Sequence, residues 1–167
     1  NFGQDKEYYR MIDDIFGFIP NNIELYKMAL IHKSASIVVD GQTIDGNGYT
    51  FKVTGAGATW DCAIYTNGGT IKNLTINASG ERAINIIQNA TNVTIDGVTA
   101  TAANYTVNVA ASAPNAVVAI KNSTLNGLCT VNVAAAGANV TVDNSTVNCN
   151  DNNTTAGESY AALCLNK

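Results

Sequence analysis

The residues that could carry acid–base, nucleophilic or metal chemistry are few in this chain of 167 residues. There are 13 Asp and Glu against 9 Lys and Arg, and His32 is the single histidine. A histidine-based triad pairs His with a nucleophile and an acid, and a His-rich metal site needs several His side chains. His32 lies outside residues 37–167, so no triad is available there, and one histidine cannot form a His-rich site; we therefore predict no catalytic residue, no metal site and no cofactor.

Threonine recurs at a fixed position of a repeated segment and is the best candidate for binding chemistry. Segments 37–44, 69–76, 93–100, 118–125 and 140–147 align without gaps and share the pattern apolar, x, Ile/Val, Asp/Lys, Asn/Gly, x, Thr, apolar. The threonine column is Thr43, Thr75, Thr99, Thr124 and Thr146. Stacked hydroxyls and methyls suit the outward side of β-strands. A flat array of this kind could bind a glycan or ice.

Two further columns describe a bend inside each segment. Asn or Gly stands at one position throughout: Gly41, Asn73, Gly97, Asn122 and Asn144. Both residue types tolerate positive φ, so we predict a left-handed residue at every bend. The preceding residue alternates in charge, as neighbouring strands of an exposed ladder prefer: Asp40, Lys72, Asp96, Lys121 and Asp143.

The spacing of these columns requires a repeating β architecture. The segments start 32, 24, 25 and 22 residues apart, and apolar residues alternate at period two on both sides of the bend. A second series of short strands runs beside the first. It carries Asn85, Asn108 and Asn132, which we interpret as a hydrogen-bonded ladder. The pattern predicts a parallel β-helix repeat domain over residues 37–167.

Residues 1–36 differ in composition and form a separate segment with two expected helices, the first ending near Gly17 and the second capped by Asn22. The stretch from Asn22 to Ser36, NIELYKMALIHKSAS, resembles the opening of bacterial ribonuclease III, and the likeness covers about residues 8–36. That family's metal-binding signature, of the form NERLEFLGD, does not follow, because the chain continues IVVDG. We therefore carry over no catalytic residue and interpret residues 1–36 as an α-helical cap.

Residues 37–167 resemble the right-handed, pectate-lyase-like β-helix superfamily in architecture rather than in a catalytic motif. That superfamily includes polysaccharide lyases and hydrolases, phage tailspikes and bacterial surface proteins. Its lyases need clustered acids for calcium and an Arg or Lys base, whereas this region spreads eight acids and five bases over all its coils. The expected fold class is mainly β: a right-handed parallel β-helix of about five coils with an N-terminal α-helical cap.

Composition narrows the expected partners. A net charge of −4 argues against nucleic acid and against an anionic membrane surface, and no apolar run approaches the roughly 20 residues of a membrane helix. The last core strand, 161–165, has no cap, so we expect either self-association through that end or a longer solenoid.

The four cysteines (Cys62, Cys129, Cys149 and Cys164) lie in or beside the expected strands. Either they are buried thiols, or Cys149 and Cys164 form a disulfide.

These observations predict a non-catalytic β-helix module that presents a side face to glycans or protein partners, as bacterial or phage surface and adhesion proteins do. One alternative is a reduced carbohydrate-active enzyme of the pectate-lyase type, a polysaccharide lyase or glycoside hydrolase. A third reading is an RNA-processing protein related to ribonuclease III. We expect an extracellular or cell-surface location, with the cytoplasm as the alternative.

Overall fold

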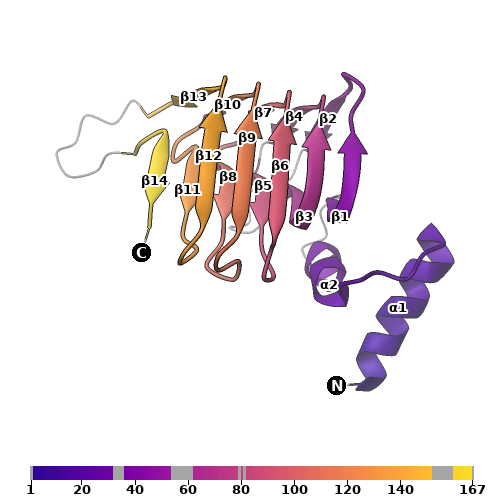
Figure 1. The fold of residues 1–167 in the computed structure, drawn as a ribbon. Coiled ribbons are helices and arrows are strands. Elements are labelled where there is room, and N and C mark those ends of the chain that lie inside the picture. The colour runs from indigo at the N-terminus through magenta and orange to yellow at the C-terminus, as the bar shows by residue number, and fades with distance from the viewer. Residues whose placement is uncertain are drawn as a thin grey trace.

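The chain forms a parallel β-solenoid with a small helical segment at its N-terminus (Figure 1). The computed structural model describes residues 2–31, 36–53, 62–78, 80, 82–151 and 160–166. Helices α1 (Phe2–Phe16) and α2 (Ile23–Ile31) come first, and every strand pairing in the described residues is parallel. The predicted mainly β fold with an N-terminal helical element is confirmed.

Each coil contributes a strand to three faces of the solenoid. The first face contains the start of β1 (Ile37–Asp45), the start of β3 (Cys62–Lys72), β5 (Arg82–Ile86), β8 (Tyr105–Val109), β11 (Val131–Val133) and β14 (Leu163–Leu165). The second contains the ends of β1 and β3, then β6 (Asn92–Asp96), β9 (Val117–Lys121) and β12 (Asn139–Asp143). The third contains β2 (Thr50–Val53), β4 (Thr75–Ala78), β7 (Thr99–Thr101), β10 (Thr124–Gly127) and β13 (Thr146–Cys149).

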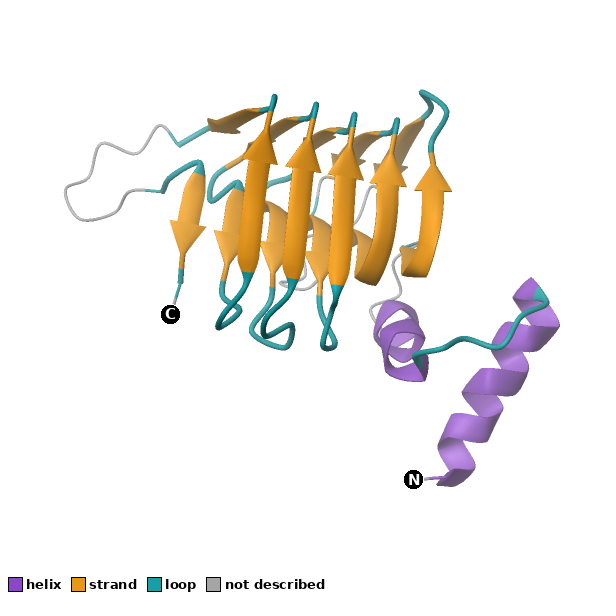
Figure 2. Cartoon of the chain, in the orientation of Figure 1, coloured by secondary structure: helices purple, strands orange, loops and turns teal. Residues whose placement is uncertain are grey.

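The solenoid is right-handed. In Figure 2 the strands of the second face run upward in front and those of the first face run downward behind, while the chain advances from right to left. The chain makes about four turns, because five stacked strands on the second face span four steps. The predicted count of about five coils was therefore one too high.

The register of the first coil differs from the predicted alignment. Ile44 pairs with Ile71 and Asp45 with Lys72, whereas Asp40 pairs with Gly68. Residues 37–39 instead lie on the first face, where Ile37 pairs with Ile64. Asp40, Gly41 and Thr43 therefore do not belong to the predicted columns, which the other four repeat segments form as aligned.

The bend between the second and third faces is a left-handed residue, as predicted, in four coils. Asn73, Gly97, Asn122 and Asn144 have φ of 51°, 64°, 49° and 44°. They stack, since each N–H of the first three donates to the carbonyl of the charged residue one coil further on, as Asn73 does to Asp96 at 3.0 Å. Gly41 also has positive φ, at 84°, but it lies beside Gly68 at the bend between the first and second faces.

We expect Gly97→Val to lower the free energy of unfolding by about 1–2 kcal/mol, because a β-branched residue is disfavoured in the left-handed region. Gly97→Asn should be nearly neutral. A Cβ at residue 97 would lie 3.1 Å from Asn73 Oδ1, the end of a side chain, and the new amide can donate to that oxygen as Asn144 does to Asn122. Urea unfolding of the two variants checks this, and equal losses would contradict the backbone explanation.

The core consists of stacked aliphatic side chains that point inward from all three faces. On the second face the inward column is Ile44, Ile71, Ile95, Ile120 and Val142. The middle three are fully buried, but Val142 on the last coil is 39% exposed. Leu163 and Leu165 on β14 are 56% and 79% exposed, so the C-terminal end of the solenoid presents apolar core to solvent.

The helical segment packs beside the first coils. Ile12 of α1 and Leu25 and Tyr26 of α2 form a buried cluster with Tyr65 and Ile87, whose side chains lie outside the main core. α1 ends before Gly17, which has φ of 73°, as predicted. His32, at the end of the ribonuclease III-like stretch, lies outside the described residues. Neither helix, over the part that the structure covers, is long and apolar enough to cross a membrane.

Candidate functional site: the third face

The third face carries a complete column of threonines. Its members, in register from one coil to the next, are Thr50, Thr75, Thr99, Thr124 and Thr146. Thr50 takes the position predicted for Thr43. Thr43 lies instead on the second face, in a column with Thr70, Thr94, Ala119 and Thr141. The second face thus carries an outward column of four threonines and one alanine beside the complete threonine column of the third face.

A second outward column runs parallel to the threonines of the third face, two residues further along each strand. It consists of Lys52, Asn77, Thr101, Asn126 and Asn148. Asn148 Nδ2 donates to Asn126 Oδ1 at 2.8 Å, which fixes the orientation of both amides. Sequence analysis missed this column, although its signal, the Thr-x-Asn or Thr-x-Thr spacing in four coils, is visible in the sequence.

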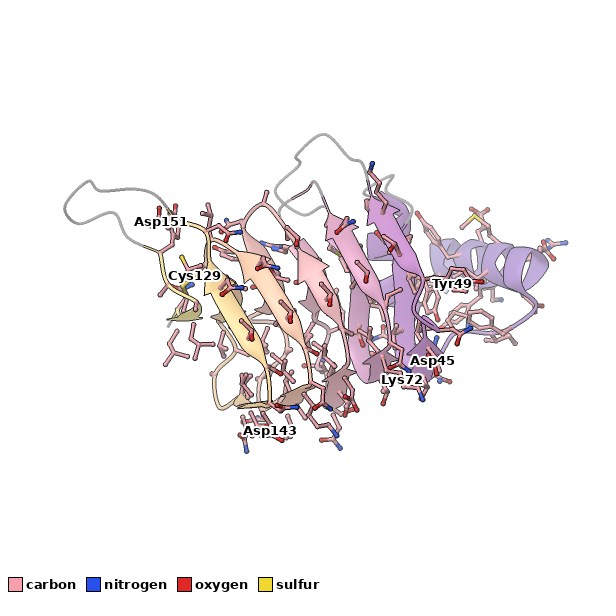
Figure 3. All side chains as sticks on the ribbon, turned by 90° about the horizontal axis from the view of Figure 1, so that it is seen from above. Asp45, Tyr49, Lys72, Cys129, Asp143 and Asp151 are labelled. Atoms are coloured by element: carbon pink, nitrogen blue, oxygen red, sulfur yellow. A yellow bond between two sulfur atoms is a disulfide. The ribbon has the colours of Figure 1, made fainter. Side chains whose placement is uncertain are left out.

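The two columns form a flat grid of hydroxyl, methyl and amide groups (Figure 3). Coils are about 4.8 Å apart along the axis, and alternate residues of a strand are about 6.7 Å apart. Lys52 is the only charged residue in the grid. Such a surface can donate and accept hydrogen bonds at regular intervals without attracting a strongly charged ligand.

The charge ladder lies on the neighbouring second face, along one side of the view in Figure 3. Its members are Asp45, Lys72, Asp96, Lys121 and Asp143. Asp45, rather than the predicted Asp40, begins it, and its Oδ2 lies 3.3 Å from Lys72 Nζ. Both side chains are exposed to solvent, which screens the pair, so we expect it to contribute little to stability.

The environment of Asp45 favours its ionised form. The N–H of Asn47, the side-chain amide of Asn73 and the Lys72 ammonium hold the pKa of Asp45 below its usual value. A carboxyl whose pKa is lower in the folded state stabilises the fold above its unfolded pKa and loses that contribution as the pH falls. Asp45 therefore has a structural role at the start of the ladder.

A buried amide ladder crosses the first face. Asn108 Nδ2 donates to Asn85 Oδ1 at 2.7 Å, and Asn132 Nδ2 donates to Asn108 Oδ1 at 2.7 Å. Asn166 Nδ2 extends the ladder to Asn132. The first three amides are at most 3% exposed, so this ladder is structural, as predicted.

The cysteines differ from the predicted alternatives. Cys129 and Cys164 form a disulfide, which ties β14 to the residues just before β11. Cys149 is a free thiol and Cys164 is bonded to Cys129, so the candidate bridge between Cys149 and Cys164 was wrong. Cys149 Sγ instead contacts the carbonyl of Leu128 at 2.9 Å. The disulfide fastens the last described strand to the open end of the solenoid.

No close group of three or more His, Cys, Asp or Glu side chains occurs in the described residues. No protein-family model matches this chain, and no significant match was found among curated proteins or solved structures. The geometry establishes the class of protein, a parallel β-solenoid with a short helical segment. Its particular function is therefore inferred from the surfaces described above.

Proposed function

We propose that this protein is a non-catalytic binding module that presents the third face to an extended glycan. The observation that carries the proposal is the two-column grid, with one threonine on each of five stacked strands. Sugar hydroxyls donate and accept hydrogen bonds, as threonine hydroxyls and asparagine amides do. A ligand with a repeating unit can meet the same groups at every coil, and its weak contacts then add along the chain.

The proposed setting is the cell surface or the extracellular space, where a bacterial or phage adhesion protein meets such polymers. The low charge of the grid favours a neutral polysaccharide over a uronate polymer. Self-association through the C-terminal end stays a prediction, supported by the exposure of Leu163 and Leu165, and sedimentation at increasing protein concentration measures it.

Replacing the hydroxyls of the third face tests the proposal. The triple variant Thr75→Val, Thr99→Val, Thr124→Val keeps the β-branched shape and removes three hydroxyls. We expect it to weaken retention on an insoluble neutral polysaccharide at least tenfold, since each hydrogen bond contributes about 0.5–1.5 kcal/mol. The measurement is a depletion isotherm on a panel of plant and microbial polysaccharides.

The second face supplies a matched control. Thr70→Val, Thr94→Val, Thr141→Val removes three hydroxyls from the neighbouring column and should leave retention unchanged. Equal loss in both variants, or none in either, contradicts the proposal. If the protein retains no polysaccharide but causes faceted ice growth, the ligand of the third face is ice and not a glycan. If the protein causes a calcium-dependent rise in unsaturated uronate absorbance, it is a polysaccharide lyase and not a non-catalytic binding module.

A further inference from the structure

A hollow of about 280 Å³ lies where the link between the two helices meets the first coil. Its walls include Phe18, Ile19, Pro20 and Tyr26 from the helical segment, and Asp40 and Gln42 from β1. Small-molecule sites generally range from about 300 to 1,000 Å³. The hollow is therefore suited to a small head group, and it lies apart from the glycan face proposed above.

Aromatic and aliphatic carbon forms one side of the hollow. The rings of Phe18 and Tyr26 meet edge to face, with centroids 5.8 Å apart and an interplanar angle of 63°. Tyr26 is 7% exposed and firmly packed, whereas Phe18 is 41% exposed and Ile19 is 71% exposed. Large exposed apolar side chains beside a hollow favour a ligand that has apolar surface of its own.

A carboxylate forms the other side. Asp40 Oδ2 accepts a hydrogen bond from the Asn22 N–H at 3.0 Å, and Gln42 Oε1 accepts one from the Asp40 N–H at 2.6 Å. These bonds hold Asp40 beside the N-terminus of α2. Burial and the nearby negative charge of Asp40 raise the pKa of Tyr26, so the phenol stays protonated beside the carboxylate.

The hollow carries one negative charge, and no cationic side chain lines it among the described residues. Asp40 is the only charged residue among the described residues that line it. None of the ion pairs found among the described residues includes Asp40. Aromatic rings and a carboxylate around a small space attract organic cations, because ring faces are electron-rich and the carboxylate supplies the opposite charge.

We propose that this hollow binds a methylated ammonium group, held between the Phe18 and Tyr26 rings and the Asp40 carboxylate. Methyl groups can contact Phe18, Ile19 and Pro20, whereas a primary ammonium is strongly hydrated and would lose its water against these carbon walls. Its source could be a free choline-like molecule or a methylated lysine on a protein partner, which share this chemistry.

Choline and its neutral carbon isostere, dimethylbutanol, provide the first test on the full chain. We expect choline to shift the amide NMR signals of Asp40 and Gln42 saturably, and the isostere to bind at least tenfold more weakly. Raising the salt concentration should weaken choline binding, because exposed charge pairs are screened. Equal binding of the isostere, or no binding of choline, overturns the proposal.

Variants on both sides of the hollow provide the second test. Asp40→Asn keeps an acceptor for the Asn22 N–H and should weaken choline binding at least tenfold. The control Asp143→Asn removes one negative charge at the far end of the solenoid and should leave binding unchanged. Phe18→Leu, at an exposed position where folding is not at risk, should weaken it about two- to fivefold, the share of one exposed cation–π contact. Equal affinities for Asp40→Asn and Asp143→Asn overturn the proposal.

A trimethyllysine peptide then distinguishes the two sources. Binding of the peptide at least tenfold tighter than choline identifies a methylated protein partner, and the reverse identifies a free choline-like ligand. Tighter binding of the unmethylated lysine peptide overturns the choice of a methylated cation. Each measurement uses the same amide signals, which also report whether each variant is folded.

Discussion

Ile95→Ala should lower the free energy of unfolding by about 2–5 kcal/mol, the largest loss we expect from one core substitution. Ile95 is fully buried in the inward column of the second face, between Ile71 and Ile120. Removing three carbons leaves a cavity that stacked strands cannot close, because their spacing is fixed by backbone hydrogen bonds on both sides. Urea unfolding followed by circular dichroism measures the loss.

The same valine-to-alanine substitution at a central and at a terminal position measures how much the neighbouring coils contribute to stability. Val118→Ala removes two buried carbons and should cost about 2 kcal/mol. Val142→Ala makes the same change on the last coil, where the side chain is 39% exposed, and should cost less than about 1 kcal/mol. Similar losses at both positions would mean that the last coil is covered in solution.

Asn108→Asp should be the most destabilising polar substitution, by about 3–5 kcal/mol at neutral pH. Asn108 is 3% exposed, and its Nδ2 donates to Asn85 Oδ1. The substitution replaces this donor with an oxygen and buries a charge with no cation in the ladder. Thermal unfolding at neutral pH measures the loss.

The sign of the pH dependence provides an independent check. Burial disfavours the charged form, so the new carboxyl should have a higher pKa in the folded than in the unfolded state. The variant is then more stable in acid than at neutral pH. This extra stability is complete below the unfolded pKa of about 3.9 and is lost as the pH rises towards the folded pKa. The Asn108→Asp variant should be most stable in acid, relative to the wild-type protein at each pH.

The exposed grid offers the matched control. Asn148→Asp changes the same atoms in a ladder on the third face, where the side chain is exposed. Solvent can hydrate that charge, so the expected loss is less than about 1 kcal/mol. Comparable losses for Asn108→Asp and Asn148→Asp would contradict the assignment of burial as the cause.

The sequence contained enough to predict the solenoid, because stacking makes each inward, outward and bend position recur. It misplaced the first coil for a specific reason. Val39-Asp40-Gly41 and Ile44-Asp45-Gly46 both match the centre of the repeat, but only the first is followed by Thr and an apolar residue at the repeat spacing, so the pattern selects the wrong bend. The true bend contains a longer turn, with Asn47 and Gly48 at positive φ before Thr50, and an alignment without gaps cannot accommodate it.

The hollow could not be predicted in the same way. Phe18 precedes α2 and Asp40 follows it, and no repeat or motif relates the two residues. Their proximity depends on how α2 packs against the outside of β1 and β3, which is a tertiary property. The disulfide is similar, since Cys129 and Cys164 meet only because β14 pairs with β11.

The amide ladders share one direction, and this gives the solenoid an electrical polarity. On the first face Asn132 donates towards Asn108, on the third Asn148 towards Asn126, and at the bend Asn144 towards Asn122. In each ladder the N–H points towards the earlier coil and the oxygen towards the later one. Aligned amide dipoles add, as they do along an α-helix. The aligned amides therefore place partial negative charge at the C-terminal end of the solenoid and partial positive charge at its N-terminal end.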